Sequence, residues 1–170
     1  FDQIRQRLKN YCLSSLGIRL VDALSFSADF TTIQTLLKQN LEFKLILEKG
    51  DEFPSTNYSD PSEYFKIAVV QDSFLEEEAF HTILLSLQTI LACRKFLVAN
   101  QEPYPELFNL TQSVSVSVSL ELVKAIESKF DDKGQVRDNA SAELGKIRKR
   151  IRDEQFRVKR LIDQIFRQAV

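Results

Sequence analysis

The sequence is poor in the residues from which most catalytic and metal centres are built. Its 170 residues include one histidine, His81, together with two cysteines and four glycines. A single histidine with no cysteine nearby supports neither a zinc site nor a Ser-His-Asp arrangement. The glycines never occur as G-x-x-x-x-G-K-[ST] or G-x-G-x-x-G, the patterns of nucleotide-phosphate loops. We therefore expect no catalytic residue and no metal site within this chain.

Paired cysteines and long apolar runs are also scarce. Cys12 and Cys93 lie far apart, each among leucines at helical spacing, which favours buried thiols over a disulfide or a pair of ligands. No apolar run is expected to reach the roughly 20 residues that a membrane-spanning helix needs. The first ten residues also lack the apolar core of a signal peptide. These features predict a cytoplasmic protein without a membrane partner.

The overall composition is typical of a globular chain. Hydrophobic residues make up 44% and charged residues 28% of the sequence, close to the average for folded domains. The length suits one domain. The chain starts at Phe1 without a methionine and stops at Val170 within a helical pattern. We therefore expect it to be a piece of a longer protein.

The spacing of apolar residues predicts an all-α fold. Apolar side chains recur at steps of three and four residues through most of the first hundred positions, the period of a helix with one buried face. Capping residues divide this pattern, because Ser, Asp and Gly suit helix ends. The predicted starts are Asp29, Asp60 with Glu63, and Ser73 with Glu76, and the predicted end is Gly50.

The stretch "QSVSVSVSLELV" has a different period. Val114, Val116 and Val118 alternate with serines, as in a β-strand. A single strand would have no partner for its backbone hydrogen bonds. We therefore interpret this stretch as either an extended connector or the start of a helix.

The acidic stretch "FDDKGQVRDNASAEL", residues 130–144, could be a metal-binding loop or a turn between helices. An EF-hand needs oxygen ligands at its first and twelfth positions and glycine at its sixth. If Gly134 is placed sixth, Lys129 is first and Ala140 twelfth, so the calcium hypothesis fails. We instead predict a turn over 131–137, followed by a helix capped by Asp138 or Ser141.

The last predicted helix carries an apolar seam of the coiled-coil type, with steps of alternating three and four residues. Glu154 and Gln168 place polar atoms in the same register. At about 1.5 Å per residue the helix would reach nearly 40 Å, which is longer than a compact domain of this size needs. The predicted packing seam consists of Leu144, Ile147, Ile151, Val158, Leu161 and Ile165.

Charge is distributed unevenly between this helix and the rest of the chain. Residues 144–168 include nine basic and three acidic side chains, a net charge of +6, whereas the remainder carries −7. Such asymmetry suits contact with a polyanion. The alternative is a solvated helix surface laced with ion pairs, although three acidic residues cannot pair nine basic ones. Both interpretations stay open on charge alone.

The segment around this helix resembles the MutS family, specifically the bacterial MutS-two branch, a MutS paralogue with a C-terminal small-MutS-related nuclease domain. That branch has a D-x-x-G-x-[IV]-x-D-x-A-S-x-x-L-x-x-[IL]-R pattern. The stretches "FDQIRQRLKNYCLSSLG" and "SFLEEEAFHTILLSLQTI" are similar to its opening and core helices. The residues that match the pattern are Asp131, Gly134, Val136, Asp138, Ala140, Ser141, Leu144, Ile147 and Arg148.

The resemblance implies a multi-helix core of MutS type with a long lever helix, taken from the N-terminal part of a larger protein. In that family the lever helices carry a clamp that closes on DNA, and an ATPase domain drives and dimerises the assembly. ATP and Mg would therefore belong to the larger protein. The branch is associated with mismatched or branched DNA, with suppression of recombination and, in some members, with ribosomes.

The resulting hypothesis divides the chain into a helical core body at 1–130, a turn and crossover at 131–137, and the start of a lever helix at 138–170. The seam would pack against a helix that returns from later in the larger protein. The alternative is a helical protein–protein interaction module without a nucleic-acid role, whose basic helix docks an acidic partner. The residues predicted to lie nearest the nucleic acid are Lys146, Arg148, Lys149, Arg150, Arg152, Lys159 and Arg160.

Overall fold

The computed structural model describes residues 1–54, 56 and 58–168. Within these residues the chain is helical and contains no β-strand, so the predicted all-α class is confirmed. An isolated antiparallel bridge joins Phe130 and Val136. The helices are α1 (Asp2–Asn10), α2 (Ser15–Ala23), α3 (Phe30–Lys49), α4 (Ser62–Ala68), α5 (Glu77–Ala99), α6 (Pro105–Leu110), a 3₁₀ turn η1 (Thr111–Ser113), α7 (Val116–Glu127) and α8 (Ala142–Gln168).

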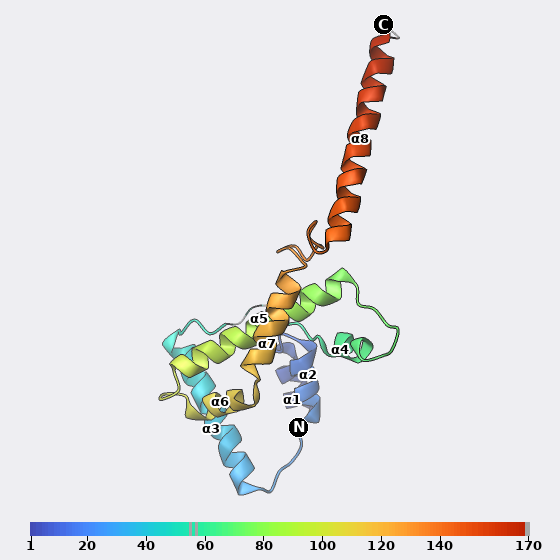
Figure 1. Cartoon of the computed structure of the whole chain (residues 1–170). Helices are drawn as coiled ribbons and strands as arrows, with labels where there is room; N and C mark the ends of the chain where they lie inside the picture. The colour runs from blue at the N-terminus through green and yellow to red at the C-terminus, as the bar shows by residue number, and fades with distance from the viewer. Residues whose placement is uncertain (55, 57, 169–170) are drawn as a thin grey trace. The chain divides into compact units, whose positions relative to one another are not determined.

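The chain forms two compact units, Phe1–Lys124 and Ala125–Val170, here called unit 1 and unit 2. The division falls within α7. In unit 1, α1 lies against α2, and α6 packs against both α3 and α5 (Figure 1). Unit 2 contains the end of α7, the segment of residues 131–138 (here called the acidic turn) and α8.

The core of unit 1 lies where α3, α5 and α6 meet. Ile46 of α3 and Tyr104, which precedes α6, are almost fully buried. They pack with Leu97 of α5 and Leu107 of α6. The Phe96 ring stacks on Tyr104, with ring centroids 6.4 Å apart. Aromatic pairs of this kind stabilise a core beyond the apolar area that they bury.

A buried carboxylate joins α3 to the start of α6. Glu42 accepts hydrogen bonds from the backbone N–H groups of Glu106 (3.0 Å) and Leu107 (2.8 Å). These N–H groups belong to the first turn of α6, where no intrahelical acceptor exists. Glu42 therefore caps a helix 64 residues further along the chain. The Tyr104 hydroxyl group, which donates to Asp51 at 2.9 Å, ties the same corner to the end of α3.

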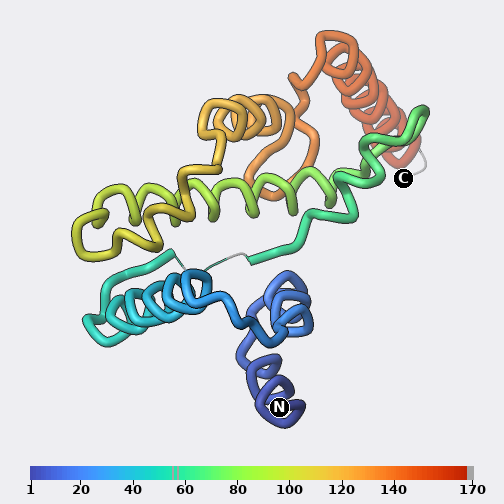
Figure 2. Tube along the Cα trace, turned by 90° about the horizontal axis from the view of Figure 1, so that it is seen from below, coloured from blue at the N-terminus to red at the C-terminus, as the bar shows by residue number. Residues whose placement is uncertain are grey.

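Polar side chains of α5 hold the segment that follows α3. The Ser86 hydroxyl donates to the Ser59 carbonyl (3.0 Å), and the Thr89 hydroxyl donates to the Thr56 carbonyl (2.9 Å). Ser86 and Thr89 are three residues apart and so share one face of the helix. Figure 2 shows α5 as the long helix of unit 1. The polar residues within this apolar helix thus satisfy backbone carbonyls of the loop.

The expectation that no segment is apolar enough to span a bilayer was wrong. In the part of the chain that the structure describes, α5 (Glu77–Ala99) has the length and composition of a membrane-spanning helix, with a mean hydropathy of 1.5 over 18 residues. The core helix of a globular unit meets the same criteria. In this chain Ile83, Leu84 and Leu97 of α5 are buried by packing. The polar residues Arg94 and Lys95 near its end obscure the apolar run in the sequence.

Two predicted helix boundaries are confirmed and one is wrong. Asp29 accepts a hydrogen bond from the Thr32 N–H (2.8 Å) at the start of α3, and Gly50 ends α3 with φ of 69°. This left-handed conformation favours glycine. Ser73 does not cap α5, because its hydroxyl donates to the Ile67 carbonyl (2.6 Å) and the helix starts only at Glu77.

Asp60 stabilises the start of α4 but does not form the predicted reciprocal pair with Glu63. It accepts a hydrogen bond from the Ser62 N–H (3.0 Å) and forms an ion pair with Arg19 of α2 at 2.5 Å. Hydrogen bonds from Ser62, followed by those from Arg19, lower the pKa of Asp60. Glu63 instead pairs with Lys66. Asp60 thereby links α2 to α4.

The serine and valine repeat proves to be the start of a helix. Val114 is extended, with φ of −80° and ψ of 115°, and α7 begins at Val116. The strand-like alternation does not produce a strand, because no neighbouring strand supplies backbone partners within the described residues.

Cys12 and Cys93 are free thiols and only half-buried, rather than fully buried as expected.

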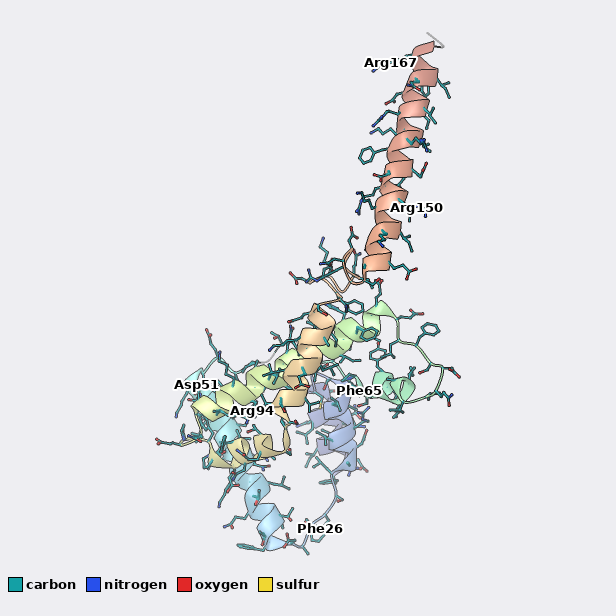
Figure 3. All side chains as sticks on the ribbon, in the orientation of Figure 1. Phe26, Asp51, Phe65, Arg94, Arg150 and Arg167 are labelled. Carbon is teal, nitrogen blue, oxygen red and sulfur yellow. The ribbon has the colours of Figure 1, made fainter. Side chains whose placement is uncertain are left out.

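Unit 1 leaves many apolar side chains exposed. Phe26, in the connection between α2 and α3, is 93% exposed (Figure 3). Tyr11 after α1 and Phe30 at the start of α3 are also largely exposed. Large exposed apolar surfaces of this kind often mark interaction sites.

Candidate nucleic-acid interface on helix α8

A tight turn precedes α8 in unit 2, as the sequence predicts. Asp131 accepts hydrogen bonds from the backbone N–H groups of Lys133 and Gln135, each at 2.9 Å. Gly134 has φ of 77°, a conformation that glycine adopts without steric cost. The hydrogen bond from Gln135 is the first cause that lowers the pKa of Asp131. The carboxylate thus serves the turn itself, which supports the structural interpretation over the calcium hypothesis.

Arg137 fastens this turn to the end of α7, a role that the sequence did not suggest. Its Nε atom donates to the carbonyls of Phe130 (2.6 Å) and Glu127 (3.1 Å). Its backbone N–H donates to the Lys129 carbonyl at 2.8 Å. These carbonyls lie at and just beyond the C-terminus of α7, where intrahelical donors are lacking. The turn and the helix end therefore form one hydrogen-bonded structure.

The start of α8 is organised by Ser141 and Asp138 in different ways. The Ser141 hydroxyl accepts a hydrogen bond from the Leu144 N–H (3.1 Å), so Ser141 is the capping residue. Asp138 instead forms ion pairs with Arg148 and Arg152, each at 2.6 Å. Arg148 also donates to the Val136 carbonyl at 2.8 Å. The hydrogen bonds from Arg148 and Arg152 lower the pKa of the Asp138 carboxyl.

The predicted seam residues lie on one face of α8, which Glu154 interrupts between Ile151 and Val158. Five of the six seam residues are exposed, and the sixth, Leu144, is half-buried. Ile162 lies on the same face, although the sequence analysis did not include it. Ile147, Ile151, Val158 and Ile162 share this face with the polar side chains of Glu154 and Gln155. The exposed fractions of Ile147, Ile151, Val158, Leu161, Ile162 and Ile165 range from 47% to 64%.

The seven residues predicted to lie near nucleic acid all belong to α8, but the structure treats them unequally. Arg148 is half-buried, and both Arg148 and Arg152 form ion pairs with Asp138. The other five side chains are exposed. Figure 3 shows the side chains of Arg150 and Arg167 on α8. Arg157, omitted from the predicted set, forms an exposed ion pair with Glu154 at 3.5 Å.

The described residues do not fit a nucleotide or metal site. No cluster of three or more His, Cys, Asp or Glu side chains occurs among them. Gly50 ends a helix and Gly134 forms a turn, while Gly17 and Gly145 lie within helices. None of these positions forms the glycine-rich loop before a helix that binds phosphates. ATP and Mg, implied by the family resemblance, therefore find no site among these residues.

An apolar pocket of unit 1 is a poorer candidate than α8. Its volume is about 240 Å³, and Leu16, Tyr58, Ile90 and Leu110 are among the residues that line it. Ligand pockets are usually larger, about 300–1,000 Å³, and contain convergent polar groups. Burial raises the pKa of Tyr58 to about 12 and also raises that of the Cys93 thiol. Both groups are thus held in their neutral forms.

The fold and the candidate interface define an all-α module that ends in a basic amphipathic helix. Three similar proteins are each named Endonuclease MutS2. Those of Geobacillus sp. (strain WCH70) and Symbiobacterium thermophilum are each 27% identical to this chain, in alignments that cover 98% of it. That of Pelotomaculum thermopropionicum is 34% identical over 98 residues, covering 57% of this chain and 12% of the relative. No family model matches the chain, and no solved structure gives a significant match.

The chain is similar to MutS2 proteins over nearly its whole length, and the resemblance predicted from the sequence is confirmed. The first two relatives described above align with nearly the whole chain. The chain spans about a fifth of their length, since the alignments cover 21% of each.

Proposed function

We propose that this chain is the core and lever part of a MutS2-type DNA-handling ATPase. Unit 1 supplies the helical core, and α8 is one arm of a lever that transmits the state of the ATPase domain to a DNA-binding clamp. The clamp and ATPase domains belong to the rest of the larger protein. The two properties of α8, an apolar face and a basic surface, support this proposal most directly.

The apolar face supports the lever role because it needs a partner helix. Six apolar side chains recur on one side of α8 over five turns and are about half exposed. Two amphipathic helices bury such faces against each other in a coiled coil. In proteins most of the stability of a helix comes from packing of its amphipathic face and not from its own backbone propensity. We propose that a returning helix of the larger protein covers the face.

We propose that no catalysis occurs within these 170 residues. ATP and Mg would bind to the ATPase domain of the larger protein, and its nuclease domain would account for the name of the relatives. The larger protein would act in the cytoplasm as a homodimer on branched or mismatched DNA, with roles in mismatch repair and suppression of recombination. Ribosome binding is a further proposed activity of the larger protein.

Sedimentation tests the role of the apolar face. In the isolated chain we expect a second copy to take the place of the missing helix, so the chain should self-associate as its concentration rises. The substitution Ile151→Asp places a charge at the centre of the face and should abolish this association. Phe74→Asp, at an exposed apolar residue of unit 1, is the control. A wild-type chain that stays monomeric at high concentration would contradict the assigned role of the face.

Salt dependence tests the proposed contact with DNA. The affinity for duplex DNA falls with salt as phosphate contacts release counterions, with a log-log slope near −0.9 per contact. Contact with about five phosphates therefore predicts a slope of about −4 to −5. The measurement is fluorescence anisotropy of a labelled duplex between 50 and 200 mM salt. If α8 served only an acidic protein partner, the chain would show no binding to the duplex even in low salt.

A further inference from the structure

Seven of the nine basic residues of α8 lie along two edges on opposite sides of its apolar face, and the other two, Lys149 and Arg167, lie on the side of the helix away from that face. Residues separated by three, four or seven positions share one side of a helix. By this spacing, Lys146, Arg150, Arg157 and Arg160 form one edge, here called the open edge. The other, here called the tied edge, consists of Arg148, Arg152 and Lys159.

Two of the three residues of the tied edge, Arg148 and Arg152, are engaged within unit 2, whereas Lys159 is exposed and forms no hydrogen bond or ion pair among the described residues. Asp138 receives hydrogen bonds from both Arg148 and Arg152 at 2.6 Å, and Arg148 also donates to the Val136 carbonyl. Arg148 contacts the acidic turn at two points and is half-buried. Phosphate binding by these two guanidinium groups would compete with a carboxylate that already orients them and neutralises part of their charge. Charge-assisted hydrogen bonds of this kind are stronger than neutral ones.

The open edge is engaged far less. Among the residues that the structure describes, no hydrogen bond or ion pair involves the side chains of Lys146, Arg150 or Arg160, and all three are exposed. Arg157 has only the exposed pair with Glu154 at 3.5 Å. Asp153 interrupts the edge and leaves it with a net charge of +3.

We propose that the open edge, and not the tied edge, is the surface of α8 that contacts the phosphate backbone of duplex DNA. From Lys146 to Arg160 the open edge extends about 21 Å along the helix axis, at 1.5 Å per residue. Duplex DNA carries one negative charge per ~1.7 Å of its axis. Complementary charge therefore exists over the whole length of the open edge. The inference rests on the proposed DNA contact and names the residues that make it.

The structure also explains how one helix could serve both DNA and a partner helix. The two edges flank the apolar face, so a helix that covers this face leaves basic residues exposed beside it. The tied edge fixes the first three turns of α8 to the acidic turn. The open edge then has a defined orientation relative to unit 2. This division of roles separates positioning residues from phosphate-binding residues on the same helix.

Matched double substitutions in the full 170-residue chain test the assignment. Lys146→Gln with Arg150→Gln removes two charges from the open edge, and Arg148→Gln with Arg152→Gln removes two from the tied edge, within the same three turns. The probe is a labelled 20-base-pair duplex, and the measured quantity is the log-log salt slope. We expect the open-edge variant to bind with a slope less steep by about two, because each lost phosphate contact changes it by about one. The tied-edge variant should keep the wild-type slope.

The possible outcomes separate the inference from the proposed function. Equal loss of slope in both variants would overturn the assignment to the open edge while leaving DNA contact by α8 intact. Salt-independent or absent binding by the wild-type chain would overturn the DNA role itself. NMR titration of the wild-type chain with the same duplex gives a second readout that needs no variant. Larger shifts for the side chains of Arg148 and Arg152 than for Arg150 would also overturn the assignment.

Discussion

The α3–α6 corner of unit 1 and the start of α8 in unit 2 are each organised around a carboxylate that accepts two hydrogen bonds from a neighbouring helix. In unit 1 the carboxylate of Glu42 is buried and receives backbone N–H groups of α6. In unit 2 the carboxylate of Asp138 is exposed and accepts hydrogen bonds from two arginine side chains of α8. The buried residues Ile46 and Tyr104 belong to the apolar cluster of the same corner.

This difference indicates what each region does. A buried carboxylate is costly to leave without its partners, so the α3–α6 corner forms as a unit with its apolar core. An exposed ion pair contributes little to stability, so the Asp138 site orients α8 more than it stabilises the fold. The α3–α6 corner of unit 1 therefore makes the large contributions to the stability of this chain. In unit 2 the ion pairs of Asp138 contribute little to stability, but they orient α8 and leave its faces exposed.

The largest predicted effect is loss of the buried side chain at Ile46. Ile46→Ala removes a fully buried group at the centre of the corner and should lower the free energy of unfolding of unit 1 by about 2–5 kcal/mol. Urea denaturation followed by tyrosine fluorescence measures this change, because all four tyrosines lie in unit 1. Leu47→Ala, at a 65% exposed residue, is the control and should change it by less than about 0.5 kcal/mol. Equal effects of the two substitutions would mean that the corner is not the core.

Substitution of Glu42 should have the second largest effect. Glu42→Ala leaves the N–H groups of Glu106 and Leu107 without their acceptor and should destabilise unit 1 by about 1.5–3 kcal/mol, the range for hydrogen bonds to charged groups. Glu42→Gln retains one carbonyl acceptor and should fall between the wild type and Glu42→Ala in the same fluorescence assay. Glu48→Ala, which removes an exposed pair with Lys44, should have almost no effect. A Glu42→Ala variant as stable as Glu48→Ala would refute the capping role.

The features that could be predicted from the sequence are those determined by nearby residues. Asp29 and Gly50 act on backbone within a few positions of themselves, so their chemical type indicates a helix start and end. The turn around Gly134 is equally local. The Glu42 cap joins residues 64 and 65 positions apart, and only the folded corner brings them together. Nothing in the local sequence around Glu42 indicates that partner.

The candidate site shows the same limit. Helical periodicity placed Arg148 and Arg152 on α8 with the other basic residues, but it does not show which of them meet a carboxylate. Asp138 lies 10 and 14 residues before them and reaches them only because the chain turns at 131–137. Ile162 was not predicted as part of the seam, because steps of three and four residues select Leu161 and Ile165 and skip the residue between them. The true period of 3.6 residues widens the apolar stripe enough to include Ile162.

A smaller effect is expected at Arg137, which fastens the acidic turn to α7. Arg137→Ala removes the two hydrogen bonds from its Nε atom to the carbonyls of Phe130 and Glu127. The two carbonyls share the single Nε–H, so the loss is that of one hydrogen bond, about 0.5–1.5 kcal/mol, and the amide of Asp131 should exchange its hydrogen a few-fold to tenfold faster. Arg137→Lys keeps the charge but cannot reproduce the guanidinium geometry, and it should restore only part of the protection. Unchanged exchange in both variants would show that the turn forms without this arginine.

The smallest predicted effect concerns the pH dependence of the Asp138 site. The arginine hydrogen bonds lower the pKa of Asp138 in the folded chain below its unfolded value of about 3.9. A lowered pKa means that the folded state binds the proton less well, so the contribution to stability is present above about pH 4. It is lost as the pH falls through the folded pKa. Protonation should release Arg148 and Arg152 and loosen the first turns of α8.

An NMR titration of the Asp138 carboxyl carbon between pH 2 and 7 measures this pKa directly. In the tied-edge variant Arg148→Gln with Arg152→Gln, the pKa should rise toward the ordinary aspartate value because both donors to the carboxylate are gone. The open-edge variant Lys146→Gln with Arg150→Gln is the matched control and should leave the titration close to that of the wild type. If the two variants shifted the pKa equally, general basic charge on α8 would be its cause. The contrast between an oriented edge bound to Asp138 and an edge open to a partner would then be lost.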